Sequence, residues 1–347
     1  MTWFGPAVDS VLDALVVPGF SRAGLAARSR LRPGFTVGDY PRLDGHTVII
    51  TGATSGIGHA AAIALARQGA AVHFLARDQA RAERARRAIA AASGRPDVSY
   101  GLADLEDPGT ARAFARDFRA THDRLDVLIH NAGAIHREFR TDAAGTELTA
   151  LGQVITPFLL TRLMMPVLLA AAPSRVIAVS SGGMYTQRLD PATLQLPASH
   201  YRGVTAYAKA KRAQVALSRE WARRLAGSGV AFHAMHPGWV DTPGIAAALP
   251  GFHRLAAPLL LSPEQGADTI AWLASAPPAR LGSGRFWHDR RPRPEHLLPR
   301  TREKDPAAAR ELWDHLAALT TPADPVRNRE APTRWPGLAL AADQPDR

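Results

Sequence analysis

The chain has 347 residues, of which 46% are hydrophobic and 21% charged, a balance typical of a soluble globular protein with one large domain or two of ordinary size. It contains no cysteine, which excludes disulfide bonds, zinc sites with cysteine ligands and a thiol nucleophile. The formal net charge is +11, but no basic–aromatic platform or helix-turn-helix pattern accompanies the arginines, so we expect no nucleic-acid partner. No apolar run approaches the roughly 18 residues of a membrane span and no secretory signal is visible, so we expect a cytoplasmic protein.

Residues 1–43 precede the first predicted core strand and form an N-terminal extension. Val11–Phe20 is apolar, but Asp13 and Pro18 interrupt it, and several arginines follow. Two interpretations remain open. The extension can be an arm that packs on the body of the protein, or residues 1–44 can make peripheral contact with a membrane as an amphipathic segment.

From Asp44 onward, short apolar runs alternate with helical stretches. We predict strands at Val48–Ile50, Val72–Ala76, Val98–Ala103, Val127–His130, Val176–Ser180 and Val230–Met235. Helices are predicted at Ala60–Gly69, Gln79–Ala92, Gly145–Ala172 and Thr205–Leu225, and after the caps at Asp107 and Ser262–Gln265. This alternation predicts an α/β fold with a doubly wound parallel sheet, helices on both faces, and ligands at the carboxyl ends of the strands.

We expect one such domain over residues 44–290. Residues 291–347 then form a C-terminal extension, which turns rich in proline and arginine. One helix is predicted near Ala307–Leu319, followed by a tail that we expect to be disordered.

A strand, a glycine turn and a helix follow one another in Thr47–Gly58, which reads Thr-Val-Ile-Ile-Thr-Gly-Ala-Thr-Ser-Gly-Ile-Gly. Gly52, Gly56 and Gly58 permit a tight turn, let backbone N–H groups approach an anion, and direct the helix N-terminus at it. The spacing is G-x-x-x-G-x-G rather than the general dinucleotide pattern G-x-G-x-x-G. We interpret the stretch as a phosphate cradle, and the alternative is a plain strand–turn–helix corner.

The sharpest chemical signal is the pair Tyr207 and Lys211. Residues four apart share one face of a helix, so both side chains can reach one site. A phenol with an ordinary pKa near 10 is a poor acid or base at neutral pH, but a neighbouring ammonium favours the phenolate and lowers that pKa. The pair can therefore exchange a proton with an alcohol or a developing alkoxide.

Together, these motifs resemble the short-chain dehydrogenase/reductase family over residues 44–290. The matching positions, in chain order, are Thr51-Gly52-x-x-x-Gly56-Ile57-Gly58, Asp104-Leu105, Asn131-Ala132-Gly133, Ser180-Ser181, Tyr207-x-x-x-Lys211 and Pro237-Gly238-x-x-x-Thr242. Within the family, the chain resembles a subgroup known in animals as dehydrogenase/reductase member 12. The resemblance implies a Rossmann-type domain and an oxidoreductase.

The resemblance also implies roles for residues. It makes Tyr207 the acid–base, Ser181 the group that holds the substrate carbonyl, and Lys211 the group that binds ribose hydroxyls and tunes Tyr207. Strand alternation places only one of Ser180 and Ser181 in the site, and we favour Ser181. The implied cofactor-binding residues are Gly52, Thr54, Ser55, Gly56, Ile57, Gly58, Asp104, Leu105, Asn131, Ala132, Gly133, Tyr207, Lys211, Pro237, Gly238, Val240 and Thr242.

The cofactor preference follows from the end of the second strand. NAD-binding proteins usually place a carboxylate there to hold the ribose 2′-hydroxyl. Arg77 occupies this position and could bind a 2′-phosphate with two hydrogen bonds, so we expect NADP(H), with NAD(H) possible because Asp78 follows directly.

One departure from the family concerns Gln153, which stands where the family has asparagine, and Thr156, where a glycine is expected. The family asparagine holds, through its main-chain carbonyl, a water that links the lysine to solvent. Pro157 has no N–H and pushes away the carbonyl four residues earlier, so we expect the Gln153 carbonyl to be unbonded and free to hold that water. We therefore count Gln153 as a fourth catalytic residue, the alternative being a helix kinked for packing.

Two long loops rim the expected site. The loop 182–205 follows Ser181, and the loop 243–261 is apolar, which favours a lipophilic carbonyl or alcohol as substrate. His136 and Tyr185 could line the cleft, Lys209 is expected in solvent, and no metal site is expected. An alternative function is a nucleotide-binding scaffold or redox sensor with little turnover. A homo-oligomer is possible.

Overall fold

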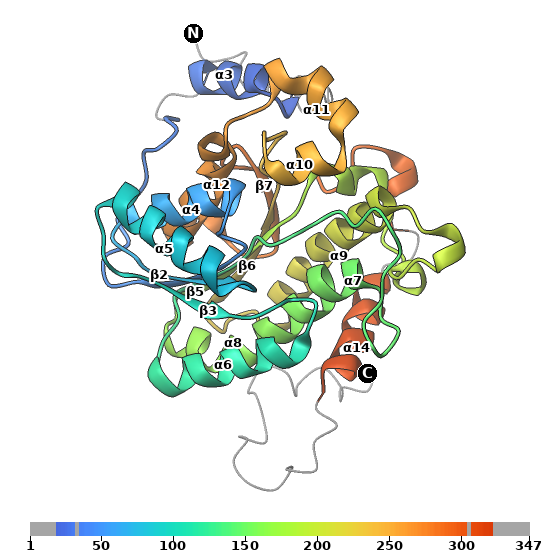
Figure 1. Ribbon diagram of the computed structural model, residues 1–347, viewed down its shortest axis with the longest axis horizontal. Helices are drawn as coiled ribbons and strands as arrows, with labels where there is room; N and C mark the ends of the chain where they lie inside the picture. The colour runs from blue at the N-terminus through green and yellow to red at the C-terminus, as the bar shows by residue number, and fades with distance from the viewer. Residues whose placement is uncertain (1–18, 32–34, 304–306, 322–347) are drawn as a thin grey trace, which may run out of the picture.

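The computed structural model describes residues 19–31, 35–303 and 307–321. In this part of the chain, eight strands form one sheet in the order β3-β2-β1-β4-β5-β6-β7-β8 (Figure 1). The strands are β1 (Thr47–Thr51), β2 (Ala71–Ala76), β3 (Val98–Leu102), β4 (Val127–His130), β5 (Ser174–Val179), β6 (Val230–Met235), β7 (Arg285–His288) and β8 (Arg291–Pro292). All neighbours pair in parallel except β7 and β8, so the predicted doubly wound α/β sheet is confirmed.

The centre of the sheet is buried on both faces. Val48, Ile49 and Ile50 of β1 have no exposed surface. A parallel strand covered on both sides reads as a continuous apolar run, which is why the central strands β1, β4 and β5 could be located from the sequence.

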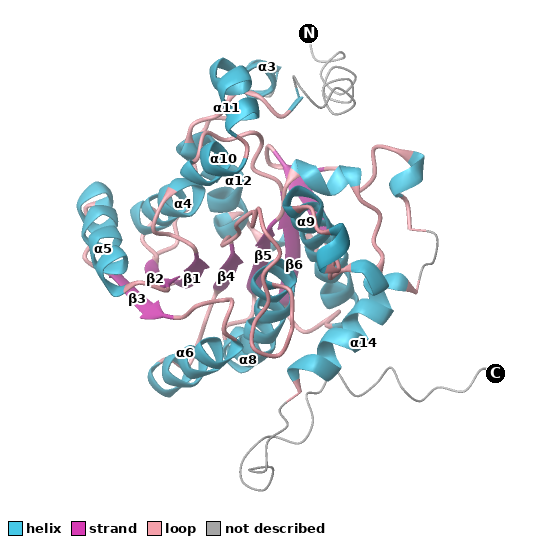
Figure 2. Ribbon diagram, turned by 45° about the vertical axis from the view of Figure 1, so that its right-hand side comes forward, coloured by secondary structure: helices cyan, strands magenta, loops and turns pink. Residues whose placement is uncertain are grey.

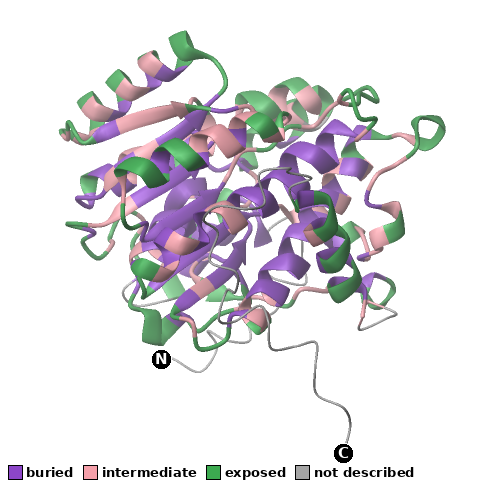
Figure 3. Cartoon of the chain, turned by 90° about the horizontal axis from the view of Figure 1, so that it is seen from below, coloured by how far each residue is buried: buried purple, intermediate pink, exposed green. Residues whose placement is uncertain are grey.

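Helices cover both faces of the sheet (Figure 2). One face carries α4 (Gly56–Arg67), α5 (Gln79–Ser93) and α12 (Pro263–Ser275), which share one buried apolar cluster. The other face carries α6 (Pro108–Thr121), α8 (Thr156–Ala170), α9 (Gly203–Arg224) and α14 (Ala308–Thr320), whose buried side chains form a second cluster. Figure 3 shows buried residues concentrated between these layers, so the core is two slabs separated by the sheet.

The remaining helical segments are short and lie mostly in the connections. They are α7 (Leu148–Ala150), the π-helix η1 (Leu151–Ile155), the 3₁₀ turns η2 (Gly182–Thr186), η3 (Pro191–Thr193), η4 (Ala198–His200), η5 (Ala257–Leu259) and η6 (Pro299–Thr301), and the helices α3 (Arg22–Leu31), α10 (Pro243–Ala248), α11 (Pro250–Ala256) and α13 (Pro278–Leu281).

The last two strands, β7 and β8, were not predicted. Phe286 and Trp287 make only a short apolar run, and the antiparallel turn that follows uses Asp289 (φ 48°) and Arg290 (φ 58°) rather than glycine. A two-residue hairpin turn of this kind is normally recognised by Asn, Asp or Gly followed by Gly. Arg290 stands where the glycine is expected, so the sequence pair carried no clear hairpin signal.

The helical segment before β5 is longer and more apolar than we expected when we found no run of membrane-spanning length. Among the described residues, one helical stretch, Leu148–Ala170, is long and apolar enough to cross a membrane by length and composition. Its apolar window is 72% buried inside the structure. It packs against the sheet, so it is a core element.

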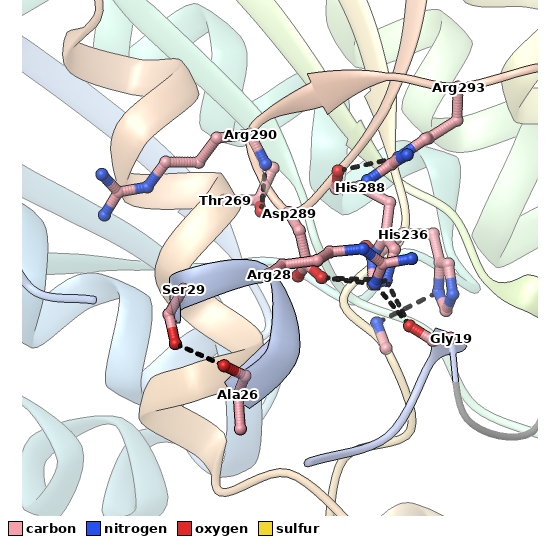
Figure 4. A network of polar contacts seen from close by, with 11 residues as sticks. Gly19, Ala26, Arg28, Ser29, His236, Thr269, His288, Asp289, Arg290 and Arg293 are labelled. Atoms are coloured by element: carbon pink, nitrogen blue, oxygen red, sulfur yellow. Dashed lines mark hydrogen bonds and ion pairs between the residues drawn. The ribbon is translucent and has the colours of Figure 1, made fainter. Parts of the chain in front are cut away.

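The described part of the N-terminal extension packs on the body. In α3, Leu25 and Arg28 are buried, and Arg28 Nη1 contacts Asp289 Oδ2 at 2.7 Å and the Gly19 carbonyl at 2.5 Å (Figure 4). Most of the apolar stretch Val11–Phe20, on which the membrane interpretation rests, lies outside the described residues. The same is true of the tail beyond residue 321, whereas the predicted C-terminal helix is α14.

Candidate active site

A cavity of about 460 Å³ opens at the carboxyl ends of the strands. Its walls come from the segments that follow β1 to β6, which is where a doubly wound sheet binds ligands. All the residues proposed above as catalytic or cofactor-binding line it: Gly52, Thr54, Ser55, Gly56, Ile57, Gly58, Arg77, Asp104, Leu105, Asn131, Ala132, Gly133, Gln153, Ser181, Tyr207, Lys211, Pro237, Gly238, Val240 and Thr242.

The glycine turn after β1 needs glycine for two separate reasons. Gly52 and Gly56 have φ of 74° and 57°, which disfavours other residues. A Cβ at Gly52 would lie 2.8 Å from the Cα of Ala132, and a Cβ at Gly58 would collide with the Gly52 carbonyl and the Asn131 amide. The turn is therefore pressed directly against the segment after β4.

Asn131 fastens this segment to the glycine turn. Its Nδ2 donates to the carbonyls of Thr51 at 2.9 Å and Gly52 at 3.2 Å. The backbone N–H groups of Asn131 and Ala132 donate to the Thr51 hydroxyl at 3.0 and 2.9 Å. Thr51 at the end of β1 and Asn131 directly after β4 thus hold the carboxyl ends of these two central strands together.

The loop after β6 lies over the glycine turn and is held by the N-terminal arm. A Cβ at Gly56 would lie 3.3 Å from the Thr242 side chain. The backbone N–H of Trp239 donates to the Phe20 carbonyl at 2.7 Å, and the Phe20 ring packs edge-on against His236 at 4.3 Å between centroids. The N-terminal extension therefore supports the loop that lines the cavity, a contact that the sequence did not indicate.

The two serines after β5 have different surroundings. Ser180 is buried and its Oγ donates to the main-chain carbonyl of Lys211 at 2.8 Å. Ser181 Oγ accepts the Gly183 N–H at 3.2 Å, and its hydrogen bond with Tyr207 lowers the pKa of that phenol. Only Ser181 faces Tyr207.

The pKa of Tyr207 is raised, whereas we expected the neighbouring Lys211 ammonium to lower it. Burial in the cavity is the larger effect and raises the pKa of Tyr207, while the Ser181 hydrogen bond lowers it. Lys211 Nζ lies 5.3 Å from the centre of the Tyr207 ring. The ammonium therefore sits beside the ring, and in this arrangement it does not outweigh desolvation.

Lys211 is itself buried, with 2% of its surface exposed. Its Nζ donates to the Val179 carbonyl at 2.9 Å and to Gln214 Oε1 at 3.2 Å. Both acceptors are neutral, and burial lowers the pKa of Lys211 to about 7.

The expectation for the Gln153 carbonyl was wrong in one respect. A π-helix forms at Leu151–Ile155, directly before Pro157, where we expected a disturbed helix. The carbonyl is not unbonded, however, because Gln214 Nε2 donates to it at 2.8 Å. The side chain of Gln153 donates to the Ala134 carbonyl at 2.7 Å, and its Oε1 is buried and has no hydrogen-bond partner among the described residues.

At the other end of the cavity, Arg77 and Arg81 both line the wall near the end of β2. Asp78, which had favoured NAD(H), caps α5 and accepts the Arg81 N–H at 2.6 Å. Its carboxylate is therefore engaged by the helix that follows it.

Three further expectations can be compared with the structure. His136 lines the cavity and contacts Glu106 Oε1 at 3.0 Å. Tyr185 does not line it, because its hydroxyl donates to the Pro294 carbonyl at 2.8 Å. Lys209 is not simply solvated, since its Nζ donates to Thr193 Oγ1 at 2.6 Å.

The residues present fit a nicotinamide dinucleotide. The turn leaves no room for a Cβ at Gly52 or Gly58, and Ser55 provides no side-chain cap for α4, so the first-turn N–H groups of α4 face the cavity as an anion site. The glycine turn and α4 would hold the pyrophosphate, and Lys211 and the loop after β6 would hold the nicotinamide half.

Comparison with known proteins agrees with this geometry. Residues 46–250 match the family model described as short chain dehydrogenase. The chain therefore belongs to the short-chain dehydrogenase/reductase family, whose members are oxidoreductases with a Rossmann-type nucleotide-binding sheet.

Individual proteins of the family are similar to this chain over most of its length. It is 39% identical to human dehydrogenase/reductase SDR family member 12, over 80% of this chain and 87% of that protein. It is 35% identical to mouse retinol dehydrogenase 14, over 89% of this chain and 97% of that one. Among solved structures, the Pseudomonas aeruginosa RhlG/NADP active-site complex superposes with a TM-score of 0.58 and 25% identity, covering 71% of this chain and 94% of that chain.

Proposed function

We propose that this protein is an NADP(H)-dependent oxidoreductase that interconverts a carbonyl and an alcohol, with Tyr207 as general acid and base. The observation that carries the proposal is that Tyr207, Ser181 and Lys211 line the same cavity as the glycine turn after β1. A phenol, a hydroxyl and an ammonium beside a dinucleotide cradle suit proton transfer coupled to hydride chemistry, which the nicotinamide supplies when bound.

The roles of the three side chains follow from their contacts. The Ser181 hydroxyl, which faces Tyr207, holds the substrate oxygen. Tyr207 gives its proton to that oxygen as the alcohol forms, and takes it back in the opposite direction. The Lys211 charge favours the phenolate and opposes the desolvation that raises the pKa of Tyr207.

The preference for NADP(H) is supported by Arg77 and Arg81, two guanidinium groups at the wall near the end of β2. A 2′-phosphate is a dianionic acceptor that arginine binds in a bidentate manner. The competing Asp78 carboxylate accepts the Arg81 N–H at 2.6 Å, so it is the less available partner for a ribose hydroxyl. The RhlG complex carries NADP in its name.

A lipophilic substrate is supported by the rim of the cavity. Trp239, Ile245 and Leu260 line it, and they come from the loop after β6 and the apolar segment that follows it. An apolar wall with a few convergent polar groups favours a carbonyl compound with a hydrocarbon body. One relative is named a retinol dehydrogenase, which is consistent with this substrate class.

The test is to follow NADPH absorbance while the purified protein is offered aldehydes and ketones of increasing hydrocarbon length, with NADH in parallel. We expect consumption of NADPH that rises with the apolar size of the carbonyl compound. Consumption of neither nucleotide with any carbonyl compound, and no reduction of NADP⁺ with the matching alcohols, would contradict the proposal.

A further inference from the structure

A buried glutamine, which the sequence did not single out, connects two parts of the candidate site. Gln214 lies on α9, three residues after Lys211, and only 5% of it is exposed. Its Nε2 donates to the main-chain carbonyl of Gln153 at 2.8 Å, and its Oε1 accepts from Lys211 Nζ at 3.2 Å. One planar amide thus contacts both an ammonium and a carbonyl.

The carbonyl that anchors this amide is available because of the chain's local chemistry. Gln153 lies in the π-helix Leu151–Ile155, and Pro157, four residues later, has no N–H to donate back to it. A buried carbonyl without a donor would carry a desolvation cost, which the Gln214 amide removes.

The contacts fix which way the amide points. The NH₂ group can only donate and the oxygen can only accept. Turned over, the amide would place its NH₂ against the Lys211 ammonium and its oxygen against the Gln153 carbonyl, both repulsive. The hydrogen-bond network therefore assigns Oε1 to the lysine.

We propose that Gln214 is a positioning residue for the proposed reaction, whose amide, anchored on the Gln153 carbonyl, keeps the Lys211 ammonium charged and beside the Tyr207 ring. This inference rests on the proposed function and names a residue that no motif of the site includes. Within the part of the chain that the structure describes, Lys211 has two hydrogen-bond acceptors, Gln214 and the Val179 carbonyl, and neither is a carboxylate. Removing one of two acceptors in a buried place makes the charge harder to keep.

Few other groups near Lys211 titrate in the same pH range, so its own titration can be followed. The titratable groups that face it are Tyr207 on α9 and His130 at the end of β4. Burial and the nearby Lys211 lower the pKa of His130 to about 3, so this histidine is neutral where Lys211 titrates. The chain has only three lysines, Lys209, Lys211 and Lys304.

The experiment is a pH titration of the full chain labelled with ¹³Cε-lysine, followed by NMR, with the signals assigned from Lys209→Arg and Lys304→Arg. Gln214→Met keeps the side-chain volume but removes both hydrogen bonds, and we expect it to lower the pKa of Lys211 by about one unit. Gln214→Glu places a carboxylate beside the ammonium, and we expect it to raise the pKa of Lys211 by about one unit.

Ser218→Ala is the matched control. Ser218 lies one turn further on the same buried face, and its Oγ donates to the Gln214 main-chain carbonyl at 2.9 Å without touching the side-chain amide. We expect this variant to leave the Lys211 titration in place. Shifts in opposite directions for Gln214→Met and Gln214→Glu support the proposal, and no shift, or the same shift in both, overturns it.

The titration needs neither nucleotide nor substrate, so two failures can be told apart. Opposite shifts in a protein that turns over no carbonyl compound contradict the proposed function and leave the Gln214 contact standing. Turnover by the wild-type protein with an unmoved Lys211 titration contradicts the role of Gln214 alone.

Discussion

Lys211 Nζ lies 5.3 Å from the centre of the Tyr207 ring, one helical turn further along α9. Burial lowers the pKa of Lys211 to about 7 and raises the pKa of Tyr207. Both shifts favour neutral side chains, so the two groups depend on specific contacts to hold charge. Those contacts are Ser181 for the phenol, and the Val179 carbonyl and Gln214 for the ammonium.

The cofactor preference is testable at Arg77. Arg77→Asp replaces the guanidinium with a carboxylate, which repels a 2′-phosphate and accepts from a ribose 2′-hydroxyl. We expect kcat/KM for NADPH to fall by about 100-fold, equivalent to losing one charge-assisted pair, while NADH improves. Arg84→Asp is the control, because Arg84 lies on the helix α5 that follows Arg77 but does not line the cavity. Unchanged kinetics with both nucleotides in Arg77→Asp would refute the assignment.

The paired serines give a second prediction. We expect Ser181→Ala to lower kcat by 10²-fold or more, in the range of one lost donor to a developing oxyanion. Ser180→Ala removes the bond to the Lys211 carbonyl and is expected to lower stability by about 1 kcal/mol with a smaller effect on kcat. Steady-state kinetics and urea unfolding on both variants check this, and a larger kcat loss in Ser180→Ala would reverse the two roles.

Pro157 offers a test of the helix that supports the site. Pro157→Ala restores an N–H four residues after Gln153, which can compete with Gln214 Nε2 for the Gln153 carbonyl. We expect a more stable helix, by urea unfolding, together with lower turnover and an altered pH profile of kcat. An unchanged pH profile would show that the π-helix serves packing alone.

The N-terminal arm supplies a stability prediction. Arg28 and Asp289 form a buried ion pair at 2.7 Å, with 1% and 9% of their side chains exposed (Figure 4). Arg28→Met leaves the Asp289 carboxylate without this partner, and we expect a loss of roughly 3–5 kcal/mol in the free energy of unfolding. The exposed pair Arg42 and Asp44, at 2.6 Å, is the comparison, and Arg42→Met is expected to leave the free energy of unfolding nearly unchanged, because an exposed ion pair stabilises little. Equal losses of unfolding free energy in the two variants would contradict a stabilising role for the Arg28–Asp289 ion pair.

The fold was predictable because its signals are local. A parallel strand buried on both faces reads as an apolar run, and the residues that follow each strand line the ligand edge, so the family motifs located the cavity wall. The hairpin at Asp289 and Arg290 was missed because Arg290 stands where such a turn normally carries glycine.

Contacts between distant segments were not predictable. Gln214 stands in an alanine-rich helix, and its role depends on a carbonyl 61 residues away in sequence. Phe20 reaches the loop after β6 from the N-terminal extension, where its main-chain carbonyl accepts the Trp239 N–H. Lys209 was expected in solvent, because its partner Thr193 lies in a loop whose path the sequence does not define.

The central claim is tested most directly by Tyr207→Phe, assayed for NADPH binding by fluorescence and for NADPH consumption with the best carbonyl compound. The proposed chemistry predicts that the variant binds NADPH within about threefold of wild type and loses 10²–10⁴-fold in kcat, the contribution of a general acid. A variant that turns over carbonyl compounds as fast as the wild-type protein would contradict it, as would a wild-type protein that binds no nucleotide.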